Sequence, residues 1–122
     1  MMDDRNLIMT KSYTFALQVI ELYKFLCNEK KEYVLSKQLL RCGTSIGANV
    51  NEAQAAISKK DFIAKISISS KEARESKYWL MLLKDSGYID PSKQKVKQLF
   101  SEIESINKIL TSIVKSAQEN HK

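Results

Sequence analysis

The sequence predicts an all-α fold, an antiparallel up-down-up-down four-helix bundle in one domain over residues 1–122. Residues that make tight turns are scarce, with 3 glycines and 1 proline, so hairpins between strands have little support. Apolar residues recur at spacings of three and four in four separate segments, which is typical of helices with one buried face. The joints between these segments are only a few residues long, which favours antiparallel neighbours.

The first helix is predicted over about residues 10–30. Its buried stripe follows spacings of four, three and four through Phe15, Val19, Leu22 and Leu26. The polar run over residues 28–32 breaks this pattern and ends the helix.

The second helix is predicted over about residues 36–56, with Ser36 as its N-cap. Gly43 and Gly47 leave its surface low in side-chain volume, so we expect the backbone of a neighbouring helix to approach closely there. The expected core face consists of Leu39, Gly43, Ile46, Val50 and Ala53.

The third helix is predicted over about residues 59–86. Ser58 and Asp61 resemble a capping box at its start. Gly87 can take the left-handed conformation that ends a helix, so Tyr88 and Ile89 should fold back over that end. The expected core seam is Phe62, Ile66, Ser69, Ala73 and Leu80, with Leu83 on its flank.

The fourth helix is predicted over about residues 91–118, with Asp90 as N-cap and Pro91 as the first helical residue. An unbroken three-four alternation follows, and it is the clearest heptad seam in the chain. Its members are Val96, Leu99, Ile103, Ile106, Leu110, Ile113 and Ala117.

The charge balance permits an anionic partner without identifying one. The formal net charge is +6, and 17 of the 20 cationic residues are lysines. Lysine ammonium groups attract phosphates as flexible point charges, yet the same surface also keeps a protein soluble, and the two interpretations weigh about equally. The N-terminus has acidic residues where a secretory leader would be basic, and the longest apolar run, residues 78–83, is too short for a membrane span. We expect a soluble, cytoplasmic protein with reduced Cys27 and Cys42 and no membrane contact.

Few residues could carry catalysis or bind a metal. The one histidine, His121, lies beside the C-terminus, so di-iron, zinc and histidine-based nucleophile sites cannot be assembled from clustered ligands. Glu52, Glu72 and Glu75 remain as acid or base groups, but such carboxylates on bundle helices are more often ion-paired than catalytic. We expect no enzyme activity, no metal site and no cofactor.

A second row of residues lies beside the core seam of the third helix. It alternates at spacings of four and three, while three polar residues of the second helix form a matching row. The members are Ile68, Glu72, Glu75, Trp79 and Leu82 on the third helix, and Ser45, Asn49 and Glu52 on the second. We call these residues the predicted packing set. They serve either contacts between the inner helices or packing between subunits, and periodicity alone slightly favours the first.

Six cations are the candidate contacts for an anionic partner. Three occupy an outward sector of the third helix that also holds Tyr78, and three crowd the start of the fourth helix, where lysines oppose the helix dipole. They are Lys60, Lys71, Arg74, Lys93, Lys95 and Lys97. Few exposed aromatic residues are expected between them, so base stacking is not predicted.

Several blocks together resemble the four-helix bundle proteins encoded in intervening sequences of bacterial 23S ribosomal RNA genes. The most telling block is Lys-Glu-Ala-Arg-Glu-Ser-x-Tyr-Trp-Leu over residues 71–80. The others are Arg-x-x-x-Ser-Ile-Gly-x-Asn-Val-x-Glu-Ala over residues 41–53, Lys-Asp-Phe over 60–62 and Gly-Tyr-Ile over 87–89. The resemblance spans nearly the whole chain.

The resemblance implies a five-fold homo-oligomeric ring. The family also looks like the accessory variability proteins of diversity-generating retroelements, which are basic pentamers that bind a reverse transcriptase and nucleic acid. We therefore expect a non-enzymatic homo-oligomer that binds RNA or another nucleic acid through its lysines. The alternative is a protein-interaction scaffold, or accessory subunit, that docks onto a partner protein such as a reverse transcriptase.

Overall fold

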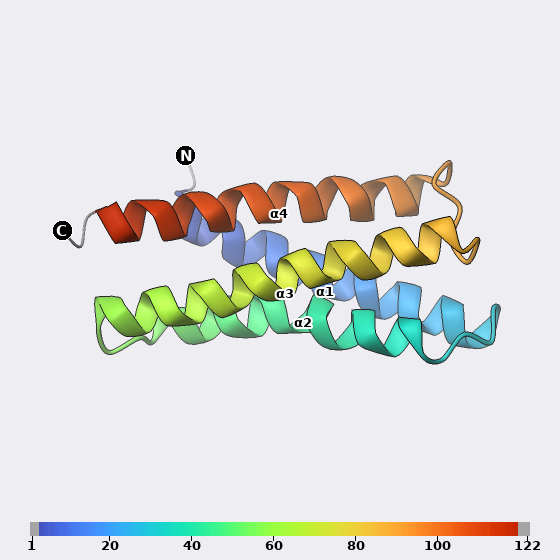
Figure 1. Cartoon of the computed structure of the whole chain (residues 1–122), viewed down its shortest axis with the longest axis horizontal. Coiled ribbons are helices and arrows are strands. Elements are labelled where there is room, and N and C mark those ends of the chain that lie inside the picture. The colour runs from blue at the N-terminus through green and yellow to red at the C-terminus, as the bar shows by residue number, and fades with distance from the viewer. Residues whose placement is uncertain (1–2, 120–122) are drawn as a thin grey trace.

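A computed structural model describes residues 3–119. This part of the chain forms four helices and no strand: α1 (Asp4–Asn28), α2 (Leu35–Gln54), α3 (Lys59–Asp85) and α4 (Gln94–Glu119). The helices run alternately in opposite directions along one long axis (Figure 1). Consecutive helices pack together and α4 closes against α1, so each helix has two neighbours. The predicted all-α, up-down-up-down four-helix bundle is confirmed.

The core runs along the inside of the bundle and takes apolar side chains from every helix. The predicted seams are buried where they were expected, except that Ala117 of α4 is only half-buried. No helix within residues 3–119 has the length and apolar character needed to cross a membrane.

The α1 helix begins six residues before the predicted start. The Asp3 carboxylate caps it by accepting a hydrogen bond of 2.9 Å from the Asn6 N–H. Ile8, which lies seven residues before Phe15 on the same face, is fully buried. The predicted start at Thr10 was too late because the buried stripe that begins at Phe15 was not extended toward the N-terminus to Ile8.

The start of α2 corrects the predicted Ser36 cap. The Glu32 carboxylate caps this helix instead, accepting hydrogen bonds from the N–H groups of Val34 (3.0 Å), Leu35 (3.0 Å) and Ser36 (2.7 Å). The Ser36 hydroxyl donates to the Glu32 carbonyl oxygen. Burial acts to raise the pKa of Glu32, but the hydrogen bonds from Ser36, Leu35 and Val34 outweigh it, so the pKa is lowered.

Two glycines of α2 lie against α1, as predicted. A Cβ added to Gly43 would lie 3.0 Å from Val19 Cγ2, and one added to Gly47 would lie 3.3 Å from Ser12 Oγ. Larger residues at these positions would push α1 and α2 apart.

Both ends of α3 follow the prediction. The Ser58 hydroxyl oxygen accepts from the Asp61 N–H at 3.0 Å, although the Asp61 carboxylate accepts from Ile57 rather than from Ser58. Gly87 has a φ of +86°. The N–H of Tyr88 bonds to the Leu83 carbonyl and that of Gly87 to the Lys84 carbonyl, the pattern of a Schellman motif.

The α4 helix begins at Gln94, three residues after the predicted start at Pro91. The Asp90 carboxylate accepts from both the N–H (2.9 Å) and the hydroxyl (2.7 Å) of Ser92, and these bonds lower the Asp90 pKa. Asp90 therefore closes a local turn instead of capping the helix, which leaves Lys93 just before α4 and Lys95 and Lys97 in its first turn.

Candidate functional site

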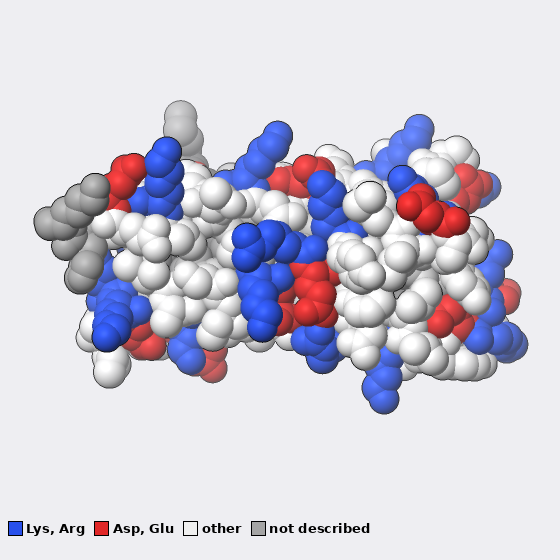
Figure 2. Space-filling view, in the orientation of Figure 1, with Lys and Arg blue, Asp and Glu red and all other residues white. Residues whose placement is uncertain are grey.

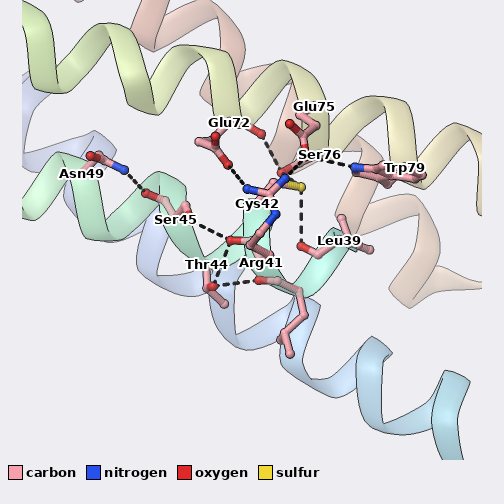
Figure 3. Close-up of polar contacts among 11 residues, drawn as sticks. Leu39, Arg41, Cys42, Thr44, Ser45, Asn49, Glu72, Glu75, Ser76 and Trp79 are labelled. Carbon is pink, nitrogen blue, oxygen red and sulfur yellow. Dashed lines mark hydrogen bonds and ion pairs between the residues drawn. The ribbon is translucent and has the colours of Figure 1, made fainter. Parts of the chain in front are cut away.

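The contact between α2 and α3 contains a charged network (Figure 3). The Arg41 guanidinium of α2 reaches two carboxylates of α3, donating to Glu72 at 3.2 Å and also to Glu75. The same Glu75 oxygen accepts a hydrogen bond of 3.1 Å from Trp79 Nε1. The Arg41 side chain is 52% exposed, whereas that of Glu72 is only 10% exposed. We call Arg41, Glu72, Glu75 and Trp79 the α2–α3 network.

Neutral polar side chains continue this contact beneath the network. The Ser69 hydroxyl of α3 donates to the Ile46 carbonyl of α2 at 2.8 Å. The Ser76 hydroxyl lies 3.3 Å from Cys42 Sγ and 2.9 Å from the Glu72 carbonyl oxygen. Burial raises the pKa of the Cys42 thiol to about 11, so the thiol stays protonated and unreactive near neutral pH.

The remaining members of the predicted packing set do not join the network. Ser45 and Asn49 bond within α2, to the carbonyls of Arg41 (2.6 Å) and Ser45 (2.9 Å). Glu52 is exposed, and Ile68 is 43% exposed. Contact between subunits through any of these residues stays a prediction.

Sequence reasoning did not assign a site role to Arg41. Its partners lie 31 and 34 residues away, and the register between two helices is not visible in a single sequence. Its place in the same motif as Ser45, Asn49 and Glu52 was the one available signal.

The six candidate phosphate contacts are all exposed, but they do not form one cluster. Lys60, Lys71 and Arg74 follow one line along the outer side of α3, which is about 40 Å long at 1.5 Å per residue. Lys93, Lys95 and Lys97 lie at the start of α4, at the end of the bundle away from Lys60. Figure 2 views one face of the bundle, and cations lie along the whole length of that face with acidic side chains between them.

One of these six cations, Lys95, lies in an ion pair, and the charge of Lys93 helps to lower the pKa of Asp90. Lys95 Nζ lies 3.8 Å from Glu21 Oε1, with the two side chains 82% and 69% exposed. Within residues 3–119, no ion pair joins Lys60, Lys71 or Arg74 to an acidic group. The outer line of α3 is therefore open to an anion.

An exposed aromatic ring lies on the same sector of α3. Tyr78 is 57% exposed, and its ring meets that of Trp79 edge-on, with centroids 5.2 Å apart and planes at 72°. Tyr78 follows Arg74 by one helical turn and is the one aromatic residue that the sequence analysis placed in this outward sector. We call Lys60, Lys71, Arg74 and Tyr78 the outer face of α3.

The carboxylates considered for catalysis lie outside two hollows on the surface of the bundle. One hollow lies at an end of the bundle, between Asp3, Arg5, Lys59 and Phe62, and another lies between α1 and α2. Neither includes Glu52, Glu72 or Glu75. Among residues 3–119, no three His, Cys, Asp or Glu side chains are grouped so that they could hold a metal, and His121 lies outside the described residues.

Comparison with known proteins identifies a family and a similar solved structure. The model of a family described as 23S rRNA-intervening sequence protein matches residues 4–112. The chain is also similar to the crystal structure of a protein with unknown function from the S23 ribosomal protein family of Bacteroides thetaiotaomicron, at 48% identity and a TM-score of 0.87. That alignment covers 93% of this chain and 99% of the other. No curated protein matches this chain.

Proposed function

The chain belongs to the family of 23S rRNA-intervening sequence proteins, and on that premise we propose that it is a non-enzymatic homo-oligomer that binds RNA or another nucleic acid. The observation that carries the proposal is the outer face of α3, where Lys60, Lys71 and Arg74 are exposed and lack acidic partners among the described residues. Arg41, by contrast, is held by two carboxylates. The outer cations thus keep their charge available for phosphates.

Binding through this surface would depend on phosphate charge rather than on base sequence. Lysine ammonium groups are point charges that neutralise phosphates and release condensed counterions, so affinity should fall steeply as salt rises. Lys93, Lys95 and Lys97 would extend the contact at the start of α4. In a ring of five subunits, the form that the family resemblance implies, weak contacts would be multiplied by symmetry.

Fluorescence anisotropy with labelled RNA and DNA, titrated over salt, tests the proposal. Changing Lys60, Lys71 and Arg74 to Gln should weaken binding and reduce the slope of log affinity against log salt by about 2 to 3. A matched control changes Lys24, Lys37 and Lys108 to Gln, which removes the same charge from exposed positions on α1, α2 and α4. If the wild type binds neither RNA nor DNA at low salt, the proposal is wrong.

The oligomeric state is tested separately by size-exclusion chromatography with light scattering. A particle of several subunits is expected for the wild type, and Trp79→Ala should lower its mass if the predicted packing set joins subunits. A monomeric wild type would remove both the oligomer and the contribution of symmetry to affinity.

A non-enzymatic role has further support in the α2–α3 network. Glu72 and Glu75 are engaged by Arg41, and neither of the two hollows that we describe adjoins them. The proposal also implies a cytoplasmic location, which fractionation of cells would check.

A second candidate function is a scaffold that docks onto a partner protein such as a reverse transcriptase. It is favoured by the uncharged hollow between α1 and α2, whose lining includes Met9, Tyr13, Gly47 and Asn51. Leu17, which is 51% exposed, continues the same side of α1 by one turn beyond Tyr13. Loss of binding to a purified reverse transcriptase on Leu17→Glu, with nucleic-acid affinity unchanged, would favour this alternative.

A further inference from the structure

We infer that Tyr78 is a base-stacking platform, and that the outer face of α3 therefore prefers single-stranded nucleic acid over duplex. This inference rests on the proposed function and specifies its ligand. Charge alone would attract either form, whereas an aromatic ring beside the cations distinguishes them.

The position of Tyr78 suits such a contact. Arg74 precedes it by four residues and Lys71 by seven, so all three lie on one side of α3 over about 10 Å of helix. Arg74 and Lys71 are exposed, and Tyr78 is 57% exposed. A nucleotide whose phosphate meets Arg74 or Lys71 would bring its base within reach of the ring.

The ring of Tyr78 also contacts a side chain that is itself held in place. The rings of Tyr78 and Trp79 form a T-shaped contact, and Trp79 Nε1 donates to Glu75, which Arg41 holds in turn. Beside Tyr78 along the helix, Lys77 pairs with Glu104 of α4 at 2.5 Å. These contacts hold the ring's surroundings in place before a ligand arrives, which reduces the entropy lost on binding.

Single strands can use this ring and intact duplexes cannot. In a duplex, the faces of the bases are already stacked on their neighbours, so an aromatic side chain on a helix surface meets only phosphates and base edges. In a single strand, the bases can turn out and stack on an aromatic ring, a contact that tolerates any sequence.

The test measures the affinity of the full chain for a labelled single-stranded oligonucleotide and for a duplex of the same length and salt. Tyr78→Ala and Tyr78→Leu should each weaken single-strand binding by about fivefold or more, and leave duplex binding within about twofold. Tyr78→Phe should bind like the wild type because it keeps the ring. The control is Tyr33→Ala, which removes a ring that is also 57% exposed from the joint between α1 and α2 and should change neither affinity.

A second measurement uses Trp79, the only tryptophan in the chain. Because its ring touches that of Tyr78, a base stacking on Tyr78 should change the tryptophan emission. We expect that change with the single strand, a smaller one with the duplex, and no single-strand excess in Tyr78→Ala.

Equal losses for the two ligands, or no loss, in Tyr78→Ala would overturn the inference. It would likewise be overturned if Tyr78→Ala lowered the mass of the particle without affecting single-strand binding, because Tyr78 would then be a contact between protein chains. In these cases the Gln variants at Lys71 and Arg74 would still lose affinity, so the proposed function would stand. Absence of wild-type binding to both ligands would instead remove the proposed function itself.

Discussion

Two sides of α3 carry charged residues in different surroundings. Toward α2, Glu72 and Glu75 meet Arg41, and Glu75 also accepts from Trp79, so the charges there neutralise one another. On the outer face of α3, Lys71 and Arg74 are exposed and meet no acidic side chain among residues 3–119. A cation therefore contributes to the fold or remains available for a ligand according to whether an acidic side chain of a neighbouring helix faces it.

Removing Arg41 should have the largest effect on the free energy of unfolding. Arg41→Ala leaves the carboxylate of Glu72, which is only 10% exposed, without its cation. Loss of one partner from a fully buried pair costs about 3–5 kcal/mol, and the half-exposed Arg41 reduces this to about 2 kcal/mol. Thermal denaturation measures it, with Lys37→Ala on the same helix as the control. A Tm equal to that of the wild type would contradict a structural role for the network.

Glu32 differs from Glu72 and Glu75 because its charge is matched by backbone N–H groups instead of a cation. Glu32→Gln should lower the free energy of unfolding by about 1 kcal/mol at pH 7. The folded-state pKa lies below the ordinary value of 4.5, so this stabilisation is present above pH 4.5 and is lost as the pH falls through the folded-state value.

The pH dependence is checked by chemical denaturation of the wild type and Glu32→Gln from pH 7 downward. Their stabilities should converge in acid, while Glu29→Gln, a change at an exposed position of the same joint, should show no such difference. A gap between wild type and Glu32→Gln that is constant with pH would show that charge is not the cause.

Neutralising the outer face of α3 should affect stability less. The double variant Lys71→Gln, Arg74→Gln should change the free energy of unfolding by no more than about 0.5 kcal/mol, since neither side chain is paired with an acidic group of the described chain. It should nevertheless lower nucleic-acid affinity, whereas Arg41→Ala, which removes no cation from the outer face of α3, should lower affinity less. Denaturation and fluorescence anisotropy on both variants test this difference. A larger loss of affinity in Arg41→Ala than in the double variant would contradict it.

The smallest effect is expected at the start of α4. Lys95 and Glu21 are 3.8 Å apart and largely exposed, so water and salt screen their attraction. A double-mutant cycle with Lys95→Ala and Glu21→Ala should give a coupling energy below about 0.3 kcal/mol. A larger coupling would place Lys95 with Arg41 among the structural cations.

Much of the fold was predictable because its signals are local. Ser58 and Gly87 mark the ends of α3 through contacts within a few residues, and the buried seams follow the helical repeat. The starts of α2 and α4 were less predictable, since Glu32 and Asp90 could each bond to several nearby N–H groups. Which group each carboxylate meets depends on the path of the joint.

The candidate site was predictable only in part. Helical periodicity placed Lys60, Lys71 and Arg74 together on an outward sector, and the structure finds them exposed there. The same periodicity did not separate the role of Glu72 and Glu75 from that of Ser45 and Asn49, which bond within α2. It also placed Tyr78 in this outward sector, where the ring is 57% exposed, but it did not show the contact of that ring with Trp79.

By itself, the sequence determined the number of helices, their buried faces and the family, because these depend on side chains repeated at three and four residues and on motifs read in order. The tertiary structure decided that Arg41 meets Glu72 and Glu75 and that Arg74 meets no acidic side chain within residues 3–119. The physical reason is that each of these outcomes depends on the register and rotation of one helix against another. Those are set by the packing of the whole core, to which residues far apart in the chain contribute together.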